Sequence, residues 1–383
     1  MIGASVNSAP AAMPGEPAAL VSWLREAAWP LWLEHGVDWA RGGFHESLDL
    51  ATLRSPAQFR RLRVVARQVY VFAEAQEHGI ARASEAVELG IAFLRERARQ
   101  ADGGYARCFD LNGRVTDAHR DLYDHAFVLL ALSSAARILP APPLHRAALA
   151  LLAYLDARLA HPGSGYAEGL PPSLPRRQNP HMHLLEALLA ASEAFGDDIF
   201  LGRATAMVDL LLDRFLDAAT GSLPEYYGDD WTPRREEGRH VVEPGHHCEW
   251  VWLLEWYGRL AGGRGRTAEA MDGLLRFVDR HGINPRLGTL YDELWSDGTV
   301  KARGSRLWPQ TERLKSEALR PGATANGLGR AAAALRRHLA DAPPGLWQER
   351  LDERGRATGE PAPASSLYHL TAGILVADRH RGP

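Results

Sequence analysis

A stretch that recurs about every sixty residues constrains the fold of this chain more than any other feature of the sequence. Each copy starts with glycine, continues with apolar or aromatic residues and usually ends in an Asp or Gly turn. The six copies read GGFHESLDL at 42, GGYARCFDLNG at 103, GSGYAEGL at 163, GSLPEYYGDD at 221, GTLYDELWSDG at 288 and GLWQERLDERG at 345. Short aromatic runs broken by such turns indicate hairpin-like loops. Periodicity of this length is typical of repeat architectures.

Hydrophobic periodicity predicts a pair of helices between successive copies of this stretch. The twelve expected helices lie near residues 17–35, 56–79, 82–98, 119–138, 143–160, 179–196, 198–217, 244–262, 265–281, 305–320, 323–341 and 364–380. No Pro/Ser-rich linker divides them, so we expect one domain over 17–383 behind a flexible tail at 1–16. Six helix pairs without a polar capping repeat favour a closed ring over an open solenoid. The predicted fold class is all-α, an (α/α)6 barrel of six inner and six outer helices with short β-hairpin loops at one end.

Unusual polar residues keep step with this repeat. One lies on every second helix, at successive spacings of 56, 60, 63, 62 and 61 residues: Arg67, Tyr123, His183, His246, Trp308 and His369. If these helices form the inner ring, the six side chains line one end of a single cavity. Histidines placed in a core for packing alone would not follow a sixty-residue repeat, so the register predicts a functional site.

Residues one helical turn away extend this set, because side chains three or four positions apart share a helix face. The pairs are His246 with Glu249 in EPGHHCEW, Asn179 with His183, and Trp308 with Glu312. His181 projects to a different side of its helix, and we expect both His181 and His125 to be structural.

Several of these positions also have a structural interpretation. Arg67 among apolar residues is costly to bury unless an ion pair compensates it. His183 is also consistent with a helix-capping histidine, and Glu312 with a surface ion pair to Lys315. His369 is the only titratable group of a small, apolar helix, where a satisfied core histidine is the usual finding.

The chemistry of the combined set points to proton transfer. Histidine titrates near pH 6.5, so it can take and return a proton at neutral pH. Two or three histidines with Arg67 suit removal of a proton from a carbon beside a carbonyl, with the guanidinium stabilising the enediolate. We expect Asn179 and His183 to contact a hydroxylated ligand, and Trp308 with Glu312 to hold a sugar ring.

Composition excludes several other classes. The net charge of −3 provides no basic surface, so nucleic acid is not an expected partner. No run approaches 18 apolar residues, so no membrane span is expected. The N-terminus lacks the pattern of a signal peptide, and Cys108 and Cys248 show no pairing pattern. We therefore expect a cytoplasmic protein, either a monomer or a homodimer.

Six motifs in order, spanning about residues 20 to 376, resemble the N-acylglucosamine 2-epimerase superfamily, which also contains mannose isomerases and cellobiose 2-epimerases. They are ARQVYVFAEA, LYDHAFVLLAL, NPHMHLLEALLAASEAFGD, EPGHHCEWVWLLEWY, RLWPQTERLKSEA and YHLTAGILV. The resemblance implies an (α/α)6 barrel and a metal-independent, cofactor-free change at C1 and C2 of an aldose through a cis-enediolate. RLWPQTE is most similar to the mannose isomerase branch, which implies interconversion of D-mannose and D-fructose.

The resemblance also implies roles by position. His246 and His369 would transfer protons, and Glu249 would orient His246. The residues implied to bind the monosaccharide are Arg67, Tyr123, Asn179 and His183.

Four alternatives remain open at this point. An aldose 2-epimerase would use the same histidines and return the proton to the other face of C2. A glycoside hydrolase would need a pair of carboxylates, such as Glu249 and Glu312. A zinc site could draw on HMH and HHCE, although histidines two apart on a helix face different ways. A non-catalytic sugar-binding protein would bind sugar and leave it unchanged.

Candidates for the cavity mouth, where a phosphate group would be held, are Arg177, Arg239, Arg303 and Arg306.

Overall fold

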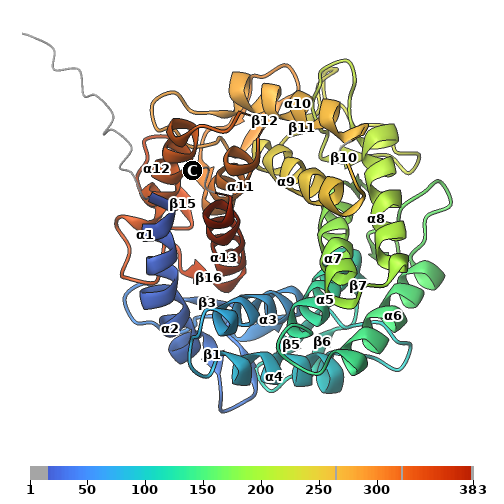
Figure 1. Cartoon of the computed structure of the whole chain (residues 1–383), viewed down its shortest axis with the longest axis vertical. Helices are drawn as coiled ribbons and strands as arrows, with labels where there is room; N and C mark the ends of the chain where they lie inside the picture. The colour runs from blue at the N-terminus through green and yellow to red at the C-terminus, as the bar shows by residue number, and fades with distance from the viewer. Residues whose placement is uncertain (1–15, 264, 321, 381–383) are drawn as a thin grey trace, which may run out of the picture.

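The computed structural model describes residues 16–263, 265–320 and 322–380, and their helices form two concentric rings (Figure 1). The inner ring consists of α3 (Leu62–Glu77), α5 (Leu122–Ala135), α7 (Asn179–Phe195), α9 (Pro244–Leu260), α11 (Leu307–Leu319) and α13 (Ala364–Arg379). Each inner helix contacts the next, and α13 returns to contact α3, so the ring is closed. The predicted (α/α)6 barrel is confirmed, with every second helix on the inside.

The outer ring alternates with the inner one along the chain. It consists of α1 (Glu16–Trp23) with α2 (Trp29–Leu31), α4 (Ala83–Phe93), α6 (Ala141–Arg158), α8 (Asp198–Leu210), α10 (Thr267–Phe277) and α12 (Ala325–Leu339). Five-residue π-helical turns extend α1, α2, α4, α8 and α10, at Leu24–Ala28, Trp32–Gly36, Leu94–Ala98, Leu211–Phe215 and Val278–Gly282. The first described helix starts at Glu16, and the rest of the predicted N-terminal tail lies outside the described residues.

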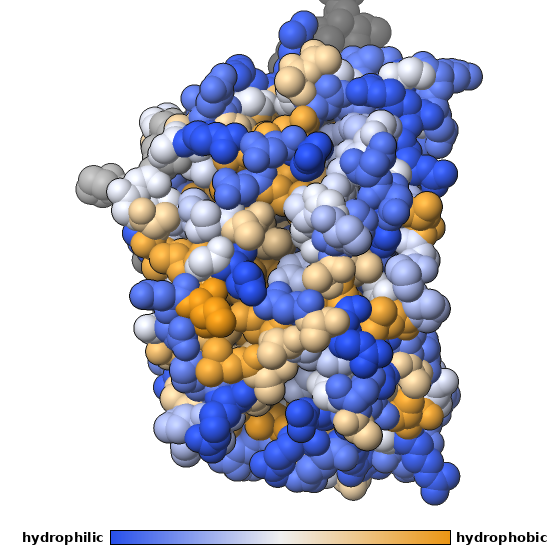
Figure 2. Space-filling model, turned by 90° about the vertical axis from the view of Figure 1, so that its right-hand side faces the viewer, coloured by the Kyte–Doolittle hydropathy of each residue, from blue (hydrophilic) through white to orange (hydrophobic). Residues whose placement is uncertain are grey.

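The helices of the inner and outer rings differ in how much of their surface is buried. Helix α13 is buried on every face from Ser366 to Ala377, as expected for a helix that is apolar all round. Outer helices bury one face, as α12 does through Ala331 and Leu335, and expose the other. Figure 2 shows one side of the outer ring, where hydrophobic residues gather near the middle of the view and hydrophilic residues dominate its top and bottom. Within the described residues, no helix is both long and apolar enough to cross a bilayer.

Short strands connect neighbouring repeats at one end of the barrel. The strand that precedes each inner helix pairs antiparallel with a strand of a neighbouring connection. The pairs are β4 (Phe59–Arg61) with β5 (Cys108–Asp110), β7 (Arg120–Asp121) with β8 (Gly169–Leu170), β9 (Arg176–Arg177) with β10 (Tyr226–Tyr227), β11 (Val241–Val242) with β12 (Glu293–Trp295), β14 (Ser305–Arg306) with β15 (Arg350–Leu351), and β16 (Ala362–Pro363) with β3 (Ser47–Leu48). The last pair joins the end of the chain to its beginning.

The expected hairpins within single connections are present in three places. These are β1 (Val37–Asp38) with β2 (Gly43–Phe44), β5 with β6 (Val115–Asp117), and β12 with β13 (Val300–Ala302). In the other connections the strands are only two residues long. Their backbone N–H and C=O groups, which would otherwise lack partners, form hydrogen bonds with a strand of the neighbouring repeat. The connections therefore hold the N-terminal ends of the inner helices together.

Four inner helices are tied to the connection before them by one recurring contact. We call the side chains that make it latch residues: His125, His181, His247 and Gln310. In His125, Nε2 accepts the backbone N–H of Tyr105 at 3.0 Å, and Nδ1 donates to the carbonyl of Asp121 at 2.7 Å. Burial lowers the pKa of each of the three latch histidines to about 4. The prediction that His125 and His181 are structural is confirmed by these bonds.

Candidate active site

A cavity of about 210 Å³ opens at the N-terminal ends of the inner helices. Eight of the nine predicted site residues lie in its wall: Arg67, Tyr123, Asn179, His183, His246, Glu249, Trp308 and His369. The wall also contains Glu243, Arg306, Glu349, Ser365 and Ser366. The exception, Glu312, lies behind the wall against His369. The sixty-residue register therefore brings all six of its members together.

His246 lies in the first turn of α9, which starts at Pro244, a favourable first helical residue. Its Nδ1 is 2.9 Å from Oε1 of Glu225, a buried carboxylate in the connection before the helix. Burial alone would lower the pKa of His246, but the charges of Glu225 and Glu243 outweigh it and raise the pKa to about 9. The ring is therefore a buried imidazolium at neutral pH.

The expectation that Glu249 orients His246 is wrong, because another carboxylate is bonded to the ring. Sharing a helix face brings the two close, but Glu225 makes the hydrogen bond to the ring, because its connection folds back over the start of α9. On the other side of the ring, Nδ2 of Asn179 lies 3.1 Å from Nε2 of His246, and Oδ1 of Asn179 has no hydrogen-bond partner among the described residues. An imidazolium donates from both nitrogens, so the Asn179 amide must turn over to place its oxygen against Nε2–H.

His369 has the opposite environment. Its Nδ1 is 2.9 Å from Oε1 of Glu312, and the other oxygen of Glu312 lies 2.5 Å from Nζ of Lys315. Burial, together with the positive charges of Arg67 and Lys315, holds the pKa of His369 well below its usual value. The imidazole is therefore neutral, with Nδ1–H donated to Glu312 and a lone pair left on Nε2.

The expected Glu312–Lys315 pair exists, but it is not on the surface. Both side chains are fully buried, and the Lys315 ammonium lies 3.6 Å from the centre of the Trp252 ring. A cation over an aromatic face is stabilised electrostatically, and more so when it is desolvated. Glu312 thus supports His369 instead of contacting a ligand.

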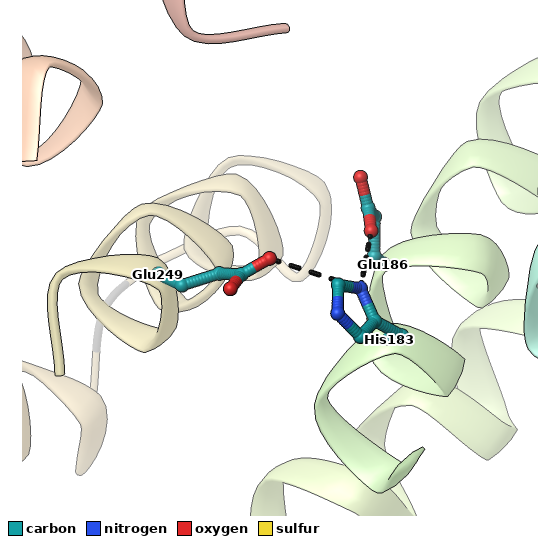
Figure 3. A group of neighbouring side chains, drawn as sticks. All are labelled: His183, Glu186 and Glu249. Carbon is teal, nitrogen blue, oxygen red and sulfur yellow. Dashed lines mark hydrogen bonds and ion pairs between the residues drawn. The ribbon is translucent and has the colours of Figure 1, made fainter. Parts of the chain in front are cut away.

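His183, Glu186 and Glu249 form a buried group between α7 and α9 (Figure 3). His183 Nδ1 donates to Glu186 at 3.1 Å and lies 3.7 Å from Glu249. Burial lowers the pKa of His183 to about 4, so its ring is neutral. Burial and the nearby Glu312 raise the pKa of Glu249 well above its usual value. Neither Glu249 oxygen has a hydrogen-bond partner among the described residues.

Arg67 is a buried cation enclosed by aromatic rings. One Nη donates to the Tyr123 hydroxyl at 2.6 Å, and the guanidinium lies 4.1 Å from the centre of the Phe127 ring and 5.0 Å from that of Tyr368. Within the described part of the chain it forms no ion pair, so the structural alternative for Arg67 is not supported. A buried, uncompensated guanidinium at a cavity wall suits a ligand oxygen that carries negative charge.

Trp308 lies between the two histidines of opposite protonation. Its ring centre is 4.9 Å from that of His246 and 5.7 Å from that of His369. The Trp308 ring can occupy this position because residue 245 is a glycine: a Cβ atom on residue 245 would lie 2.7 Å from the ring. The glycine of PGH therefore has a packing role next to the cavity.

The acidic residues that the connections contribute were not among the predicted site residues, although the repeat contains a signal for them. At one equivalent position an acid occurs in five of the six stretches, and in four of them its side chain accepts a backbone N–H at the entry to the following inner helix: Glu46, Glu168, Glu225 and Asp292. The fifth is Glu349, whose counterpart at the helix entry, Pro363, has no N–H to donate. Glu349 instead accepts from Ser366 at 2.8 Å and lines the cavity, where burial raises its pKa to about 7.

The four mouth candidates have different positions. Arg306 lines the cavity and is paired with Glu243 at 2.6 Å and with Asp292 at 3.0 Å. Arg239 lines a separate surface pocket. The cavity wall does not include Arg177 or Arg303.

Three groups of side chains have the residue types and spacing to hold a metal ion: His183, Glu186 and Glu249; Glu225, Glu243 and His246; and Glu249, Glu312 and His369. The alternative built on HMH and HHCE is not supported. Its members His181 and His247 use both ring nitrogens in latch contacts.

Comparison with known proteins gives concordant results. The family model for N-acylglucosamine 2-epimerase (GlcNAc 2-epimerase) matches residues 42–373. A mannose-6-phosphate isomerase from Rhizobium meliloti (strain 1021) is 38% identical over 369 residues, covering 93% of this chain and 95% of that protein. Two solved structures share the fold. A D-mannose isomerase has a TM-score of 0.84 at 23% identity, covering 97% of this chain and 100% of that one. The cellobiose 2-epimerase from Bacillus thermoamylovorans B4167 has a TM-score of 0.85 at 17% identity, covering 96% and 100%. The resemblance of the motifs is confirmed, and the chain belongs to the N-acylglucosamine 2-epimerase family of sugar isomerases and epimerases.

Proposed function

We propose that this chain is a metal-independent isomerase that interconverts D-mannose and D-fructose through a cis-enediolate, with histidines as acid and base. The observation that carries this proposal is the opposite protonation of two histidines on either side of Trp308. The pKa of His246 is raised to about 9, whereas that of His369 is held well below its usual value. One cavity therefore holds a proton donor and a proton acceptor at neutral pH.

In this proposal His369 is the base and His246 the acid. The imidazolium of His246 protonates the ring oxygen, and the resulting imidazole takes the proton of the O1 hydroxyl as the sugar opens. The free Nε2 of His369 then removes the proton from C2, and the electron pair moves toward O1 to give the enediolate. Return of the proton from His369 to C1, with transfer of the O2 proton to O1 through His246, gives the ketose. Return to the opposite face of C2 would give the epimer.

Arg67 is placed to stabilise the negative charge of the enediolate. Its guanidinium has no carboxylate partner among the described residues, and its Nε has no hydrogen-bond partner there. Preorganised donors in a water-poor site are worth several kcal/mol when charge develops beside them, of the order of 2.7–4 kcal/mol for a single donor. The N-terminal ends of the inner helices, which face the same cavity, add a smaller favourable field.

The size and charge of the cavity favour an uncharged monosaccharide. Its volume of about 210 Å³ is below the ~300–1,000 Å³ usual for drug-sized ligands, and leaves little room for a disaccharide. Carboxyl groups of Glu243, Glu249 and Glu349 line the wall, and Glu243 already compensates Arg306. A phosphate dianion would therefore meet few free cations near the opening.

Proton NMR of the chain with D-mannose in D2O and EDTA tests this proposal. Appearance of fructose with deuterium at C1 or C2 is the expected result. Glucose without fructose would identify a 2-epimerase, and loss of activity in EDTA would overturn metal independence. Faster turnover of mannose 6-phosphate than of mannose would overturn the uncharged substrate. Cleavage of an aryl glycoside would favour the hydrolase alternative.

Substitution of the two histidines tests the mechanism separately. His246→Ala and His369→Ala are each expected to reduce kcat by about 10²-fold or more, because positioned acid–base groups contribute 10²–10⁴-fold. The melting temperature of each variant should stay close to that of the unmodified chain. Near-normal turnover in both variants would remove this mechanism.

A further inference from the structure

Glu349 lines the active-site cavity, but the proposed reaction gives it no role. At the equivalent position of other connections, each of three glutamates uses both carboxylate oxygens to accept hydrogen bonds from the protein: Glu46, Glu168 and Glu225. Those bonds hold the entry to an inner helix. In the sixth connection the entry residue is Pro363, which has no N–H, so Glu349 does not make the corresponding bond.

The donors that Glu349 does bind converge on one oxygen. The Ser366 hydroxyl donates to Oε2 at 2.8 Å, and the indole N–H of Trp347 donates to the same oxygen at 3.2 Å. In the ranges that the structure describes, no donor is bonded to Oε1. Each carboxylate oxygen can accept two hydrogen bonds, and an acceptor without a donor is unfavourable in a site that is poor in water. Because Glu349 lines the cavity, Oε1 is the oxygen that it offers to a ligand.

The Glu349 carboxyl is held in place from two sides. Its backbone carbonyl accepts the N–H of Leu307, the first residue of α11, at 3.0 Å, and its side chain is bonded to Ser366 in the first turn of α13. These two helices also carry Trp308 and His369. An acceptor fixed between two elements of the barrel can select a ligand group by its position.

The level of Glu349 along the barrel axis indicates which part of a sugar it meets. Ser366 lies one helical turn before His369 on α13, and the cavity opens at the N-terminal ends of the inner helices. Three helical residues rise by about 4.5 Å, so the Glu349 carboxyl lies nearer to the opening than the base that removes the C2 proton. The hydroxyls at C3, C4 and C6, beyond the reacting carbons, are therefore the candidates for this contact.

We propose that Glu349 is a specificity-determining residue whose Oε1 accepts a hydrogen bond from one hydroxyl of the sugar beyond C2. This inference rests on the proposed function, because it concerns the same cavity and the same substrate. Pro363 contributes indirectly, since the missing backbone donor leaves the carboxyl to the ligand.

Calorimetry with 1,5-anhydro-D-mannitol tests this hydrogen bond without the reaction, because the analogue keeps the hydroxyls at C3, C4 and C6 and cannot open its ring. Glu349→Gln should lower the affinity by about tenfold or more, as for loss of a hydrogen bond to a charged group. The amide oxygen of glutamine can accept both bonds that Oε2 now accepts, so the melting temperature should change little. Equal affinity in the variant and the unmodified chain, or no binding to the unmodified chain, would overturn the inference.

The matched control is Glu46→Gln, at the equivalent position of the first connection and outside the cavity wall. It removes the charge that pairs with Arg61 at 2.6 Å. This variant should therefore lose stability and bind the analogue as the unmodified chain does. Weaker binding in Glu46→Gln, equal to that in Glu349→Gln, would show that the position acts through the fold and would overturn the direct contact.

Pro363→Ala tests the same bond with Glu349 intact. It restores a backbone N–H at the entry to α13, and the carboxylate should turn to that donor as Glu46 turns to the N–H of Arg61. Affinity for 1,5-anhydro-D-mannitol should then fall, whereas unchanged affinity would overturn the role given to Pro363.

Deoxy sugars identify the hydroxyl. With the unmodified chain, KM should rise by about tenfold for one of 3-deoxy-, 4-deoxy- and 6-deoxy-D-mannose relative to D-mannose. In Glu349→Gln the same removal should cost little, because the bond is already lost. Losses that add for all three sugars would overturn the inference. If the unmodified chain binds the analogue more tightly than Glu349→Gln does but leaves D-mannose unchanged, the proposed function fails and the contact of Glu349 stands.

Discussion

Nδ1 of His246 and Oε1 of Glu225, from residues 21 positions apart, lie 2.9 Å from each other, and this contact makes the histidine an acid. Because the Glu225 charge is the largest influence that raises the pKa of His246 to about 9, Glu225→Gln should lower it. The proposed acid is active below its pKa and inactive above it. The alkaline limb of kcat/KM, expected near pH 9, should therefore move down by about one pH unit or more.

The matched control for this measurement is Glu293→Gln, which removes a carboxylate paired with Lys301 outside the cavity wall. Its pH profile for mannose should overlay that of the unmodified chain. An alkaline limb that stays in place in Glu225→Gln would contradict the assignment of His246 as the acid.

Lys315→Met should affect the other limb of the profile. Lys315 is one of the positive groups that hold the pKa of His369 low, so its removal should raise that pKa. The proposed base is active above its pKa, and the acid limb of kcat/KM should therefore move to higher pH, with a lower plateau because Glu312 loses its partner. The control is Lys301→Met, from an exposed pair, which should leave both limbs unchanged. A lower plateau without a shifted limb would contradict the influence of Lys315 on the pKa of His369.

The ring of helices and the members of its cavity are predictable from the sequence because both follow from local register. The helical period of the apolar residues predicts the twelve segments. Every second helix carries one polar residue of the sixty-residue register, and closure of the ring brings these residues together at one end of the barrel. Arg67 and His369 meet the same cavity although they lie near opposite ends of the chain. Apolar character on every face marks α13 as an inner helix, but α11, which carries Glu312 and Lys315, shows no such signal.

The partners of the histidines are less predictable, because they depend on how separate segments pack. Glu225 reaches His246 from a connection whose strand pairs with the entry to α7. The sequence spacing of three residues favoured Glu249, which instead lies near His183. The sequence spacing also does not predict that the Glu312–Lys315 pair is buried, because the same i, i+3 pattern is common on exposed helices.

His125→Gln tests the latch residues through stability at low pH. The pKa of His125 is lowered to about 4 in the folded state, against about 6.5 when unfolded, so the unfolded chain binds more protons in this range. Stability from this group is complete above pH 6.5 and is lost as the pH falls toward 4, by about 1.4 kcal/mol per pH unit. Glutamine can keep both hydrogen bonds, as Gln310 does, without titrating. Urea unfolding at pH 7.5 and 5 should therefore show similar stability at the higher pH and a smaller loss in the variant.

The reverse substitution, Gln310→His, is the companion to this experiment. It should add a titrating group at the same structural position and steepen the loss of stability below pH 6.5. If His125→Gln and Gln310→His both leave the pH dependence of unfolding unchanged, the latch contacts do not couple protonation to folding.

Gly245→Ala should be destabilising although alanine is the better helix former. A Cβ at this position would lie 2.7 Å from the Trp308 ring and 2.9 Å from Pro309, so both must move, at a cost of about 1–3 kcal/mol. Since Trp308 forms part of the cavity wall, KM for mannose should rise as well. Gly202→Ala in α8 is the matched control, because no atom lies within 4 Å of its added Cβ, and there the substitution should stabilise by up to about 1 kcal/mol. Thermal unfolding of the two variants therefore separates close packing at the cavity from helix propensity, and stabilisation by both would refute the packing role of the PGH glycine.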